Sequence, residues 1–227
     1  MRKVSGVKGR AVPLNKADVD TDQIMPKQFL KRIERSGFGP YAFYDWKKDP
    51  DFVMNVPAYQ GAPIMLAQQN FGCGSSREHA VWGLEDSGVE AIIAPSFGDI
   101  FRNNSSKVGL LTIQLSQDDV DYLMARHEEL PTAEIIVDVQ TQTVSTGDGA
   151  WSRSFELDPF VKHRLLNGLD DVGLTLQHDD DIAKFEETRT KLKPDTSAAA
   201  LNPLQPGCAR TDAELEEGRP SGRPSRS

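Results

Sequence analysis

Short apolar runs separated by polar turns characterise the first third of the chain. Residues 4–14 predict an extended segment, and the apolar run at residues 64–67 predicts a buried strand. Between them, residues 15–22 form a polar turn, and residues 38–46 are aromatic but interrupted by glycine and proline. This part of the chain is therefore predicted to consist of short strands and packed loops.

The middle third alternates between strand-like apolar runs and apolar positions at helical spacing. Gly88 stands at the position of a C-terminal stop for the first of the predicted helices. Strands that alternate with helices indicate parallel pairing, with the helices covering the sheet. The predicted strands are residues 89–94 and 110–115, and the predicted helices are residues 76–87, a short one within 97–107, and 117–130.

The last third returns to strand-like patterns and then to helices. Residues 134–139 and 142–145 predict a hairpin, which residues 151–157 continue. Asp158 followed by proline is typical of a helix N-terminus, so a helix is predicted there through Leu166. A final helix is predicted from about residue 180 to residue 191.

The end of the chain differs in composition. Residues 194–227 hold five prolines and no aromatic residue. Such a segment buries too little apolar surface to offset the entropy of ordering it. We therefore predict one domain over residues 1–193 and a disordered tail over residues 194–227.

Charge and hydropathy limit the classes of partner. The 227 residues carry a net charge of −8, which argues against nucleic acid, because binding to phosphates needs a basic surface. No apolar run reaches the roughly 18 residues of a membrane span, and no apolar signal-peptide segment follows the basic N-terminus. Neither nucleic acid nor a membrane is expected as a partner, and the expected location is the cytoplasm.

An acidic protein binds an anion only where cations gather locally. The candidates are an early group, Lys27, Lys31, Arg32 and Arg35, and the later residues Arg77, Arg102 and Lys107. Metal binding is not expected, since two cysteines, Cys73 and Cys208, are too few for an iron–sulfur cluster or a structural zinc site.

Residues 70–79 connect the predicted strand at 64–67 to the predicted helix at 76–87. Gly72 and Gly74 permit positive φ angles and the close approach of a ligand. A helix start attracts anions through its free N–H groups, and Arg77 adds a planar fork suited to a carboxylate. We interpret this loop as a binding site for a small carboxylate-bearing substrate.

The same loop has simpler interpretations. Ser75 and Glu78 have the spacing of a capping box, which by itself indicates only a capped helix. A phosphate-binding loop is disfavoured, because the lysine followed by serine or threonine is absent. His79 and Cys73 are assigned to packing, since no partner for a catalytic role is identifiable from the sequence.

Four stretches together resemble one family. NFGCGSSREHA at 70–80 resembles the signature of the swivel domain of the aconitase superfamily. Three more stretches resemble the small subunits of bacterial 3-isopropylmalate dehydratase: DVDTDQIMPKQFLKRIERSGFG at 18–39, IIAPSFGDIFRNNS at 92–105 and NGLDDVGLTLQHDDDIAKFE at 167–186. The resemblance implies an α/β fold of the swivelling β/β/α kind, with three layers, a central parallel sheet and a second, mostly antiparallel sheet.

The resemblance also implies an activity in leucine biosynthesis. The family interconverts 2-isopropylmalate and 3-isopropylmalate by removing water to give isopropylmaleate and adding it back. A four-iron cluster in the large subunit serves as the Lewis acid. This chain is then expected to bind no cofactor itself, to accept a dicarboxylate, and to act as a hydro-lyase only with a cluster-bearing large subunit.

Matching the family's motif residue by residue gives catalytic roles to Ser75 and Arg77. Ser75 is matched to the general base, acting as its alkoxide, and Arg77 to the arginine that also contacts the substrate carboxylate. Substrate binding is assigned to Ser76, Gly74, Thr21, Leu30, Lys31 and Arg32. Leu30 lies in a stretch that looks like the substrate-discriminating loop, where an apolar residue is expected to meet the isopropyl group.

Several alternatives stay open. Ser75 cannot both cap the helix tightly and act as a base, so either Ser76 is the cap or the cap loosens on binding. Leu30 fits an ordinary core position equally well, and residues 20–22 are assigned to shaping their loop rather than to a metal. A sister enzyme acting on methylmalate, citraconate or a homocitrate-type acid is the second hypothesis, and a non-catalytic anion-binding or scaffolding module is the third.

Overall fold

The computed structural model describes residues 1–31 and 34–189. The chain divides into two compact units, one from Met1 to Gln177 and the other from His178 onward. The predicted boundary after residue 193 and the predicted tail lie outside the described residues.

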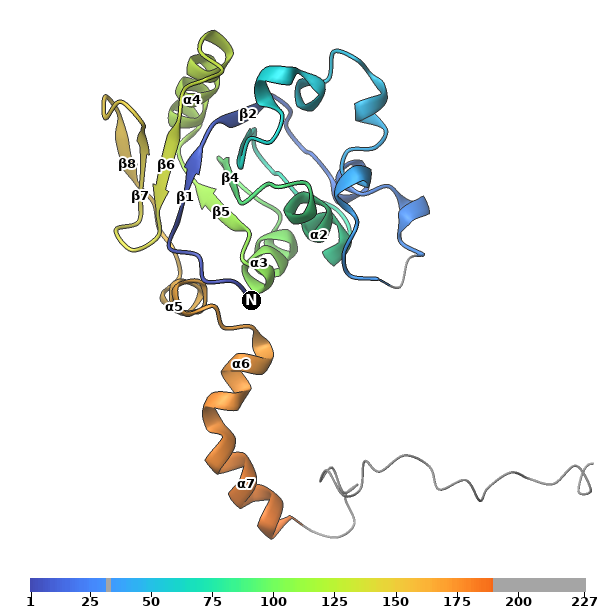
Figure 1. Cartoon of the computed structure of the whole chain (residues 1–227), viewed down its shortest axis with the longest axis vertical. Coiled ribbons are helices and arrows are strands. Elements are labelled where there is room, and N and C mark those ends of the chain that lie inside the picture. The colour runs from blue at the N-terminus through green and yellow to red at the C-terminus, as the bar shows by residue number, and fades with distance from the viewer. Residues whose placement is uncertain (32–33, 190–227) are drawn as a thin grey trace, which may run out of the picture. The chain divides into compact units, whose positions relative to one another are not determined.

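Two four-stranded sheets form the frame of the first unit (Figure 1). The parallel sheet has the order β2-β3-β4-β5, and the antiparallel sheet has the order β1-β6-β7-β8. The strands are Gly6–Gly9 (β1), Ala11–Leu14 (β2), Ile64–Ala67 (β3), Ala91–Ala94 (β4), Leu111–Gln114 (β5), Ile135–Asp138 (β6), Thr143–Thr146 (β7) and Ser152–Ser154 (β8).

Helices follow most of the parallel strands, and short 3-10 helices fill the long connection between β2 and β3. The α-helices of the first unit are Thr21–Ile24 (α1), Glu78–Asp86 (α2), Asp99–Val108 (α3), Gln117–Glu129 (α4), Pro159–Asn167 (α5) and Asp171–Thr175 (α6). The 3-10 helices in that connection are Lys27–Phe29, Gly39–Tyr41, Trp46–Lys48, Val53–Asn55 and Pro57–Tyr59. The second unit contains α7 (Asp179–Thr188), preceded by a 3-10 turn at Leu176–His178.

The parallel sheet is buried on both faces, and its side chains point alternately into two cores. In β3, Ile64 and Leu66 join the core shared with α4 and the antiparallel sheet, whereas Met65 and Ala67 join the core covered by α2 and α3. This alternation follows from the two-residue period of a strand. The result is the β/β/α arrangement of three layers, so the expected fold class is confirmed (Figure 1).

Most of the elements expected from local pattern are present. The strands and helices of the middle third and the hairpin of β6 and β7 are confirmed, with ends shifted by a few residues. Asp158 caps α5 by accepting hydrogen bonds from the N–H groups of Phe160 and Val161. None of the helices in the two described ranges has the length and apolar composition needed to cross a bilayer.

The predicted polar turn at residues 15–22 contains an element that the pattern did not indicate. Residues 21–24 form α1, which begins with a capping box between Asp20 and Gln23. The Asp20 carboxylate accepts hydrogen bonds from the N–H groups of Asp22 and Gln23 at 2.7 and 2.8 Å. Asp20 therefore shapes the loop through local hydrogen bonds, as expected.

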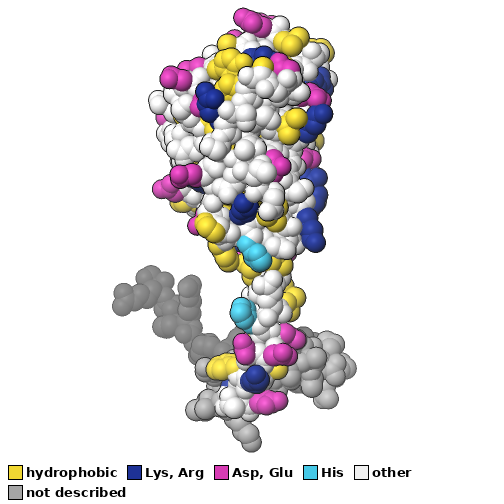
Figure 2. Space-filling model, turned by 90° about the vertical axis from the view of Figure 1, so that its left-hand side faces the viewer, with side chains coloured by type: hydrophobic (Ala, Val, Ile, Leu, Met, Phe, Trp, Pro, Cys, Tyr) yellow, Lys and Arg dark blue, Asp and Glu magenta, His cyan; other side chains and the backbone are white. Residues whose placement is uncertain are grey.

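Acidic and basic side chains are interspersed on the face drawn in Figure 2, which lies over the antiparallel sheet and α5. A surface of mixed charge attracts polyanions less strongly than a continuous basic one. The exclusion of nucleic acid as a partner stays a prediction.

His127 in α4 is a buried titratable side chain. It is fully buried, and its Nδ1 lies 2.8 Å from the carbonyl oxygen of Leu123. Burial lowers the pKa of His127 from its ordinary value of 6.5. The unfolded chain therefore takes up a proton at a pH where the folded chain does not, so the contribution of His127 to stability is lost as the pH falls below about 6.5.

We expect the free energy of unfolding to decrease between about pH 7.5 and about pH 5.5, by at most about 1.4 kcal/mol per pH unit from this one group. In the His127→Gln variant this position cannot titrate, so its free energy of unfolding should decrease less over the same pH range. Urea unfolding of both proteins at the two pH values measures the difference. Equal decreases would show that His127 does not titrate in this range.

Candidate active site

The connections that follow β2 and β3 pair with each other beyond the ends of the strands. Because the strands are parallel, both connections leave the sheet at its carboxyl edge. The N–H of Gly72 donates to the carbonyl of Val19 at 2.7 Å, and the N–H of Thr21 donates to that of Cys73 at 3.0 Å. Ligands of open α/β sheets bind at this edge. The glycine-rich loop at residues 70–77 is therefore held at the position where a ligand is expected.

The loop is held from its other side by the connection that follows β4. The N–H of Phe71 donates to Ser96 O at 3.1 Å, and the N–H of Gly98 donates to Phe71 O at 2.9 Å. The Phe71 ring is fully buried and meets the Phe101 ring edge to face, with 5.4 Å between the centroids. The loop is thus fixed by hydrogen bonds on both sides and anchored by one aromatic side chain.

Two glycines give the loop its shape. Gly72 and Gly74 have φ angles of +75° and +89°, a region that side chains disfavour. A Cβ atom at Gly72 would also collide with the ring of Phe101. The requirement for glycine that the sequence indicated is therefore confirmed at both positions.

Ser75 and Ser76 are exposed at the end of this loop. The carbonyl oxygen of Ser75 accepts two hydrogen bonds, from Thr21 Oγ1 at 2.9 Å and from the N–H of Arg77 at 2.8 Å. The two serine hydroxyls have no hydrogen-bond partner within residues 1–31 and 34–189. The backbone of Ser75 is therefore fixed, while its side-chain oxygen is free to act on a ligand.

The predicted capping box between Ser75 and Glu78 is wrong. Helix α2 begins at Glu78, and its N-cap residue is Arg77, which makes no side-chain capping hydrogen bond. The two glycines and the hydrogen bond from the N–H of Arg77 to the carbonyl of Ser75 keep residues 72–76 in a non-helical conformation. Both serines therefore precede the N-cap residue of the helix. Neither Ser75 nor Ser76 caps the helix, so capping does not restrict the hydroxyl of Ser75.

Arg77 points toward α1 and forms an ion pair there. Its Nη1 contacts Oδ1 of Asp22, and its side chain is 21% exposed. The second oxygen of Asp22, Oδ2, lies 3.5 Å from Nζ of Lys27. The three side chains form a row of alternating charge that sums to +1, and the carboxylate of Asp20 lies nearby, beside Gly74.

His79 and Cys73 have surroundings that fit packing. The ring of His79 lies against Phe38 and Trp82, with centroid distances of 5.4 and 4.8 Å. Burial lowers the pKa of His79, while burial and the nearby carboxylate of Asp20 raise the pKa of the Cys73 thiol. A thiol with a raised pKa is a poor nucleophile at neutral pH, in agreement with the assignment made from the sequence.

The stretch expected to discriminate substrates, residues 28–32, begins within the 3-10 helix at Lys27–Phe29. The Phe29 ring stacks on Tyr41 at 4.3 Å, which anchors the start of this stretch. Leu30 is half-buried and packs against the core beneath, while Lys31 is exposed. Arg32, also assigned to substrate binding, lies outside the described residues.

Thr21, which was assigned to substrate binding, is buried and hydrogen-bonded to the loop. Its side chain is 2% exposed, and its hydroxyl is used in the hydrogen bond to Ser75 O. Thr21 therefore positions the loop from within the core. Contact between Thr21 and a substrate stays a prediction, with no accessible surface to support it.

Sequence reasoning missed Asp22 as the partner of Arg77. The two residues are remote in sequence, and no local spacing links them. The pairing follows from the parallel arrangement of β2 and β3, which was not predicted for these two segments and which brings their connections to the same sheet edge. Lys27, by contrast, was among the cations named as candidates.

The chain does not offer the ligands of an iron–sulfur cluster. Cys73 is the one cysteine among the described residues, and within them no group of three or more His, Cys, Asp or Glu side chains is placed to hold a metal ion. A four-iron cluster needs three or four cysteine ligands. These residues therefore do not fit such a group, and its assignment to a partner chain stays a prediction.

Family models match most of the chain. Residues 1–118 match the aconitase C-terminal domain, and residues 121–159 match LeuD_N. Residues 171–194 match the C-terminal domain of the 3-isopropylmalate dehydratase small subunit.

Individual relatives agree with these models. The 3-isopropylmalate dehydratase small subunit of Rubrobacter xylanophilus is 54% identical over 194 residues, which cover 86% of this chain and 98% of that protein. The 3-isopropylmalate dehydratase small subunit of a Parafrankia species is 53% identical over 189 residues, which cover 83% of this chain and 96% of that protein. The crystal structure of 3-isopropylmalate dehydratase (LeuD) from Methanocaldococcus jannaschii is 26% identical, with a TM-score of 0.59, and the match covers 79% of this chain and 98% of that one.

Replacing Thr21 tests whether its hydroxyl holds the glycine-rich loop at residues 70–77. Thr21→Val keeps the volume but leaves the carbonyl of Ser75 without this bond, so we expect a loss of about 1–2 kcal/mol in stability. Thr21→Ser keeps the hydroxyl and serves as the matched control. Urea unfolding measures both, and equal stabilities of the Val and Ser variants would contradict the role given to the hydroxyl.

Proposed function

The chain belongs to the family of 3-isopropylmalate dehydratase small subunits, and from this membership we propose that it supplies one half of a hydro-lyase active site. The reaction proposed is the interconversion of 2-isopropylmalate and 3-isopropylmalate through isopropylmaleate, in leucine biosynthesis. The observation that carries the proposal is the loop at residues 70–77. It presents a free serine hydroxyl beside a paired arginine at the carboxyl edge of a parallel sheet.

Arg77 is the residue proposed to bind a substrate carboxylate. Only its Nη1 is used by Asp22, and the remaining N–H groups of the guanidinium have no hydrogen-bond partner in the described part of the chain. A guanidinium presents donors on two edges, so one edge can hold Asp22 while another binds a carboxylate. An acidic protein thereby offers a local cation to an anionic substrate.

Ser75 is the residue proposed to move the proton. Removing water from a malate requires that a proton leave the carbon next to the hydroxyl-bearing carbon, and Ser75 takes that proton and later returns it. A serine hydroxyl is a weak acid, so its alkoxide needs stabilisation. The cation of Arg77 and the free N–H groups at the start of α2 lie next to it in the chain and supply that stabilisation.

The other half of the site is assigned to a large subunit. Ser75 and Ser76 are exposed rather than enclosed, and this chain does not provide cysteines for a cluster. A four-iron cluster carried by the partner would supply the Lewis acid for the substrate hydroxyl. The residues of this chain contribute the base, the carboxylate contact and the apolar contact of Leu30, and the complex is proposed to work in the cytoplasm.

Reconstitution tests the proposal directly. The chain is mixed with a cluster-bearing large subunit of the family, and the ultraviolet absorbance of isopropylmaleate is followed. We expect turnover by the mixture only. Turnover of a methylmalate or homocitrate-type acid in place of isopropylmalate would assign the chain to a sister activity, and no turnover with any large subunit would refute the enzymatic role.

In the assembled enzyme, Ser75→Ala should lower kcat by about 10²–10⁴-fold, because it removes the group that accepts the proton. Ser76→Ala, on the neighbouring exposed hydroxyl, is the matched control and should act mainly on KM. Size-exclusion chromatography should show that both variants still assemble. Near-normal kcat in Ser75→Ala would show that the base is another group.

Leu30 is proposed to contact the isopropyl group, so Leu30→Arg should disfavour this substrate. We expect kcat/KM for 3-isopropylmalate to fall at least about tenfold, as for other pockets that recognise aliphatic groups. Leu30→Met conserves volume and should change kcat/KM little. If Leu30→Arg lowers the melting temperature and leaves kcat/KM unchanged, then Leu30 is a core residue only.

A further inference from the structure

Asp22 contacts the proposed carboxylate-binding arginine, yet the sequence indicates only that it shapes its loop, and the proposed function gives it no role. We propose that Asp22 is a positioning residue, which holds the Arg77 guanidinium in the orientation that receives the substrate carboxylate, with Lys27 holding Asp22 in turn. This inference rests on the proposed function of Arg77. It concerns how the site is prepared before a substrate binds.

The backbone of Asp22 is fixed relative to the catalytic loop. The N–H of Asp22 donates to the capping carboxylate of Asp20 at 2.7 Å, which sets the first turn of α1. The preceding residue, Thr21, is bonded to Cys73 O through its N–H and to Ser75 O through its hydroxyl. Asp22 therefore sits on an element that is hydrogen-bonded to the same loop that carries Arg77.

The ion pair occupies only part of the guanidinium. Nη1 of Arg77 and Oδ1 of Asp22, the two atoms in contact, are both inaccessible to solvent. Nε and Nη2 have no partner among residues 1–31 and 34–189. The pairing therefore holds one end of the guanidinium and leaves other donors for a ligand.

The two oxygens of Asp22 have separate partners. Oδ1 meets Arg77 and Oδ2 lies 3.5 Å from Nζ of Lys27, so the carboxylate is held from both sides. The Asp22 side chain is 35% exposed and that of Arg77 is 21% exposed, whereas Lys27 is 74% exposed. The Arg77 contact is the more shielded one, and a shielded pair is weakened less by solvent and salt.

Asp22 could either position Arg77 or compete with the substrate for it, and the two roles predict opposite effects of removing Asp22. Asp22 and the two cations sum to one positive charge, so the row still attracts an anion. If Asp22 merely occupied the substrate's place on Arg77, its removal would strengthen substrate binding. If it positions Arg77, its removal frees a long side chain, and substrate binding then has to order that side chain again at a cost in entropy.

Steady-state kinetics of the assembled enzyme distinguish these cases. We expect Asp22→Asn to raise KM for 3-isopropylmalate about tenfold or more, which corresponds to about 1.4 kcal/mol in binding, with a smaller change in kcat. Asp22→Glu, which keeps the carboxylate, should recover a substantial part of the lost affinity. Lys27→Met should raise KM by a smaller factor, because it removes only the outer support of Asp22.

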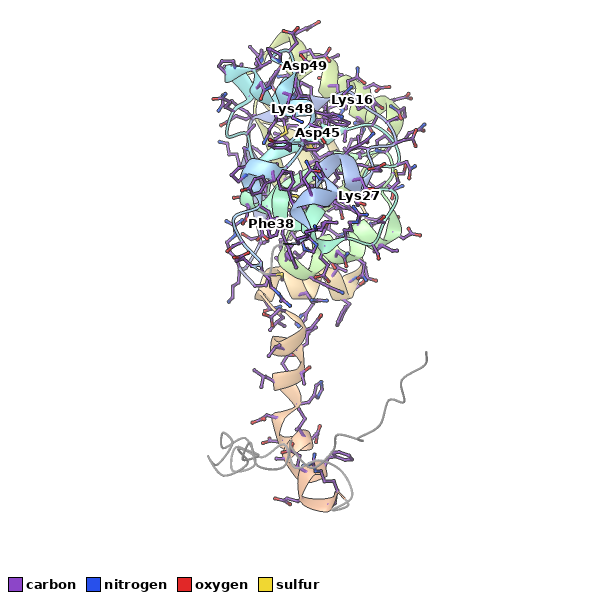
Figure 3. The ribbon with its side chains drawn as sticks, turned by 90° about the vertical axis from the view of Figure 1, so that its right-hand side faces the viewer. Lys16, Lys27, Phe38, Asp45, Lys48 and Asp49 are labelled. Atoms are coloured by element: carbon purple, nitrogen blue, oxygen red, sulfur yellow. The ribbon has the colours of Figure 1, made fainter. Side chains whose placement is uncertain are left out.

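Asp45→Asn is the matched control. Asp45 forms an exposed ion pair with Lys48 at 2.6 Å, and Figure 3 shows these two side chains on the same face as Lys27 but apart from it. This variant removes one negative charge from that face and leaves the row at Arg77 intact. Its KM and kcat should equal those of the wild type, which shows that a change in net charge is not the cause of the effect.

Each outcome assigns the result to one cause. An unchanged or lowered KM in Asp22→Asn overturns the positioning role, and so does a raised KM that Asp22→Glu does not improve. If Asp22→Asn fails to assemble, Lys27→Met decides, and a wild-type KM in Lys27→Met overturns the proposal. A wild-type complex without turnover refutes the proposed function instead, since the variants are compared only against an active wild type.

Discussion

Hydrogen bonding between the connections that follow β2 and β3 is the constraint on which the site depends. The two connections are 54 residues apart at Thr21 and Ser75, and parallel strands bring them to one sheet edge. There the backbone pairing continues past the strands, and the hydroxyl of Thr21 closes it against Ser75. Without this pairing, the glycine-rich loop would have no fixed position relative to α1, and Arg77 would have no partner.

The same constraint explains how a serine in this loop can have a fixed backbone and a free side-chain hydroxyl. Backbone bonds from two neighbouring connections hold residues 71–77, while positive φ at Gly72 and Gly74 turns the serines outward before α2 begins. The side-chain hydroxyl of Ser75 is then spared from capping. Fixing the backbone rather than the side chain is a way to preorganise a base without using its lone pairs.

Electrostatics in the site is local, in contrast to that of the whole molecule. The chain carries a net charge of −8, yet Arg77 and Lys27 share the single carboxylate of Asp22, so these three side chains sum to +1. For the proposed ligand, short-range pairing would outweigh the charges of distant surface residues, because these charges are screened within about 10 Å at moderate ionic strength. Ser75 and Ser76 remain exposed, which fits a family whose members are subunits of a larger enzyme.

Elements whose signals are local could be predicted from the amino-acid sequence alone. Apolar periodicity predicted the strands and helices, Asp158 predicted its helix start, and the glycines predicted the loop, because each depends on neighbours a few residues away. Contacts between remote segments required the folded chain. Serine spacing predicted a cap that the loop geometry prevents, and Thr21 turned inward to hold Ser75. The pairing of Asp22 with Arg77 follows only from parallel strands that place two remote connections side by side.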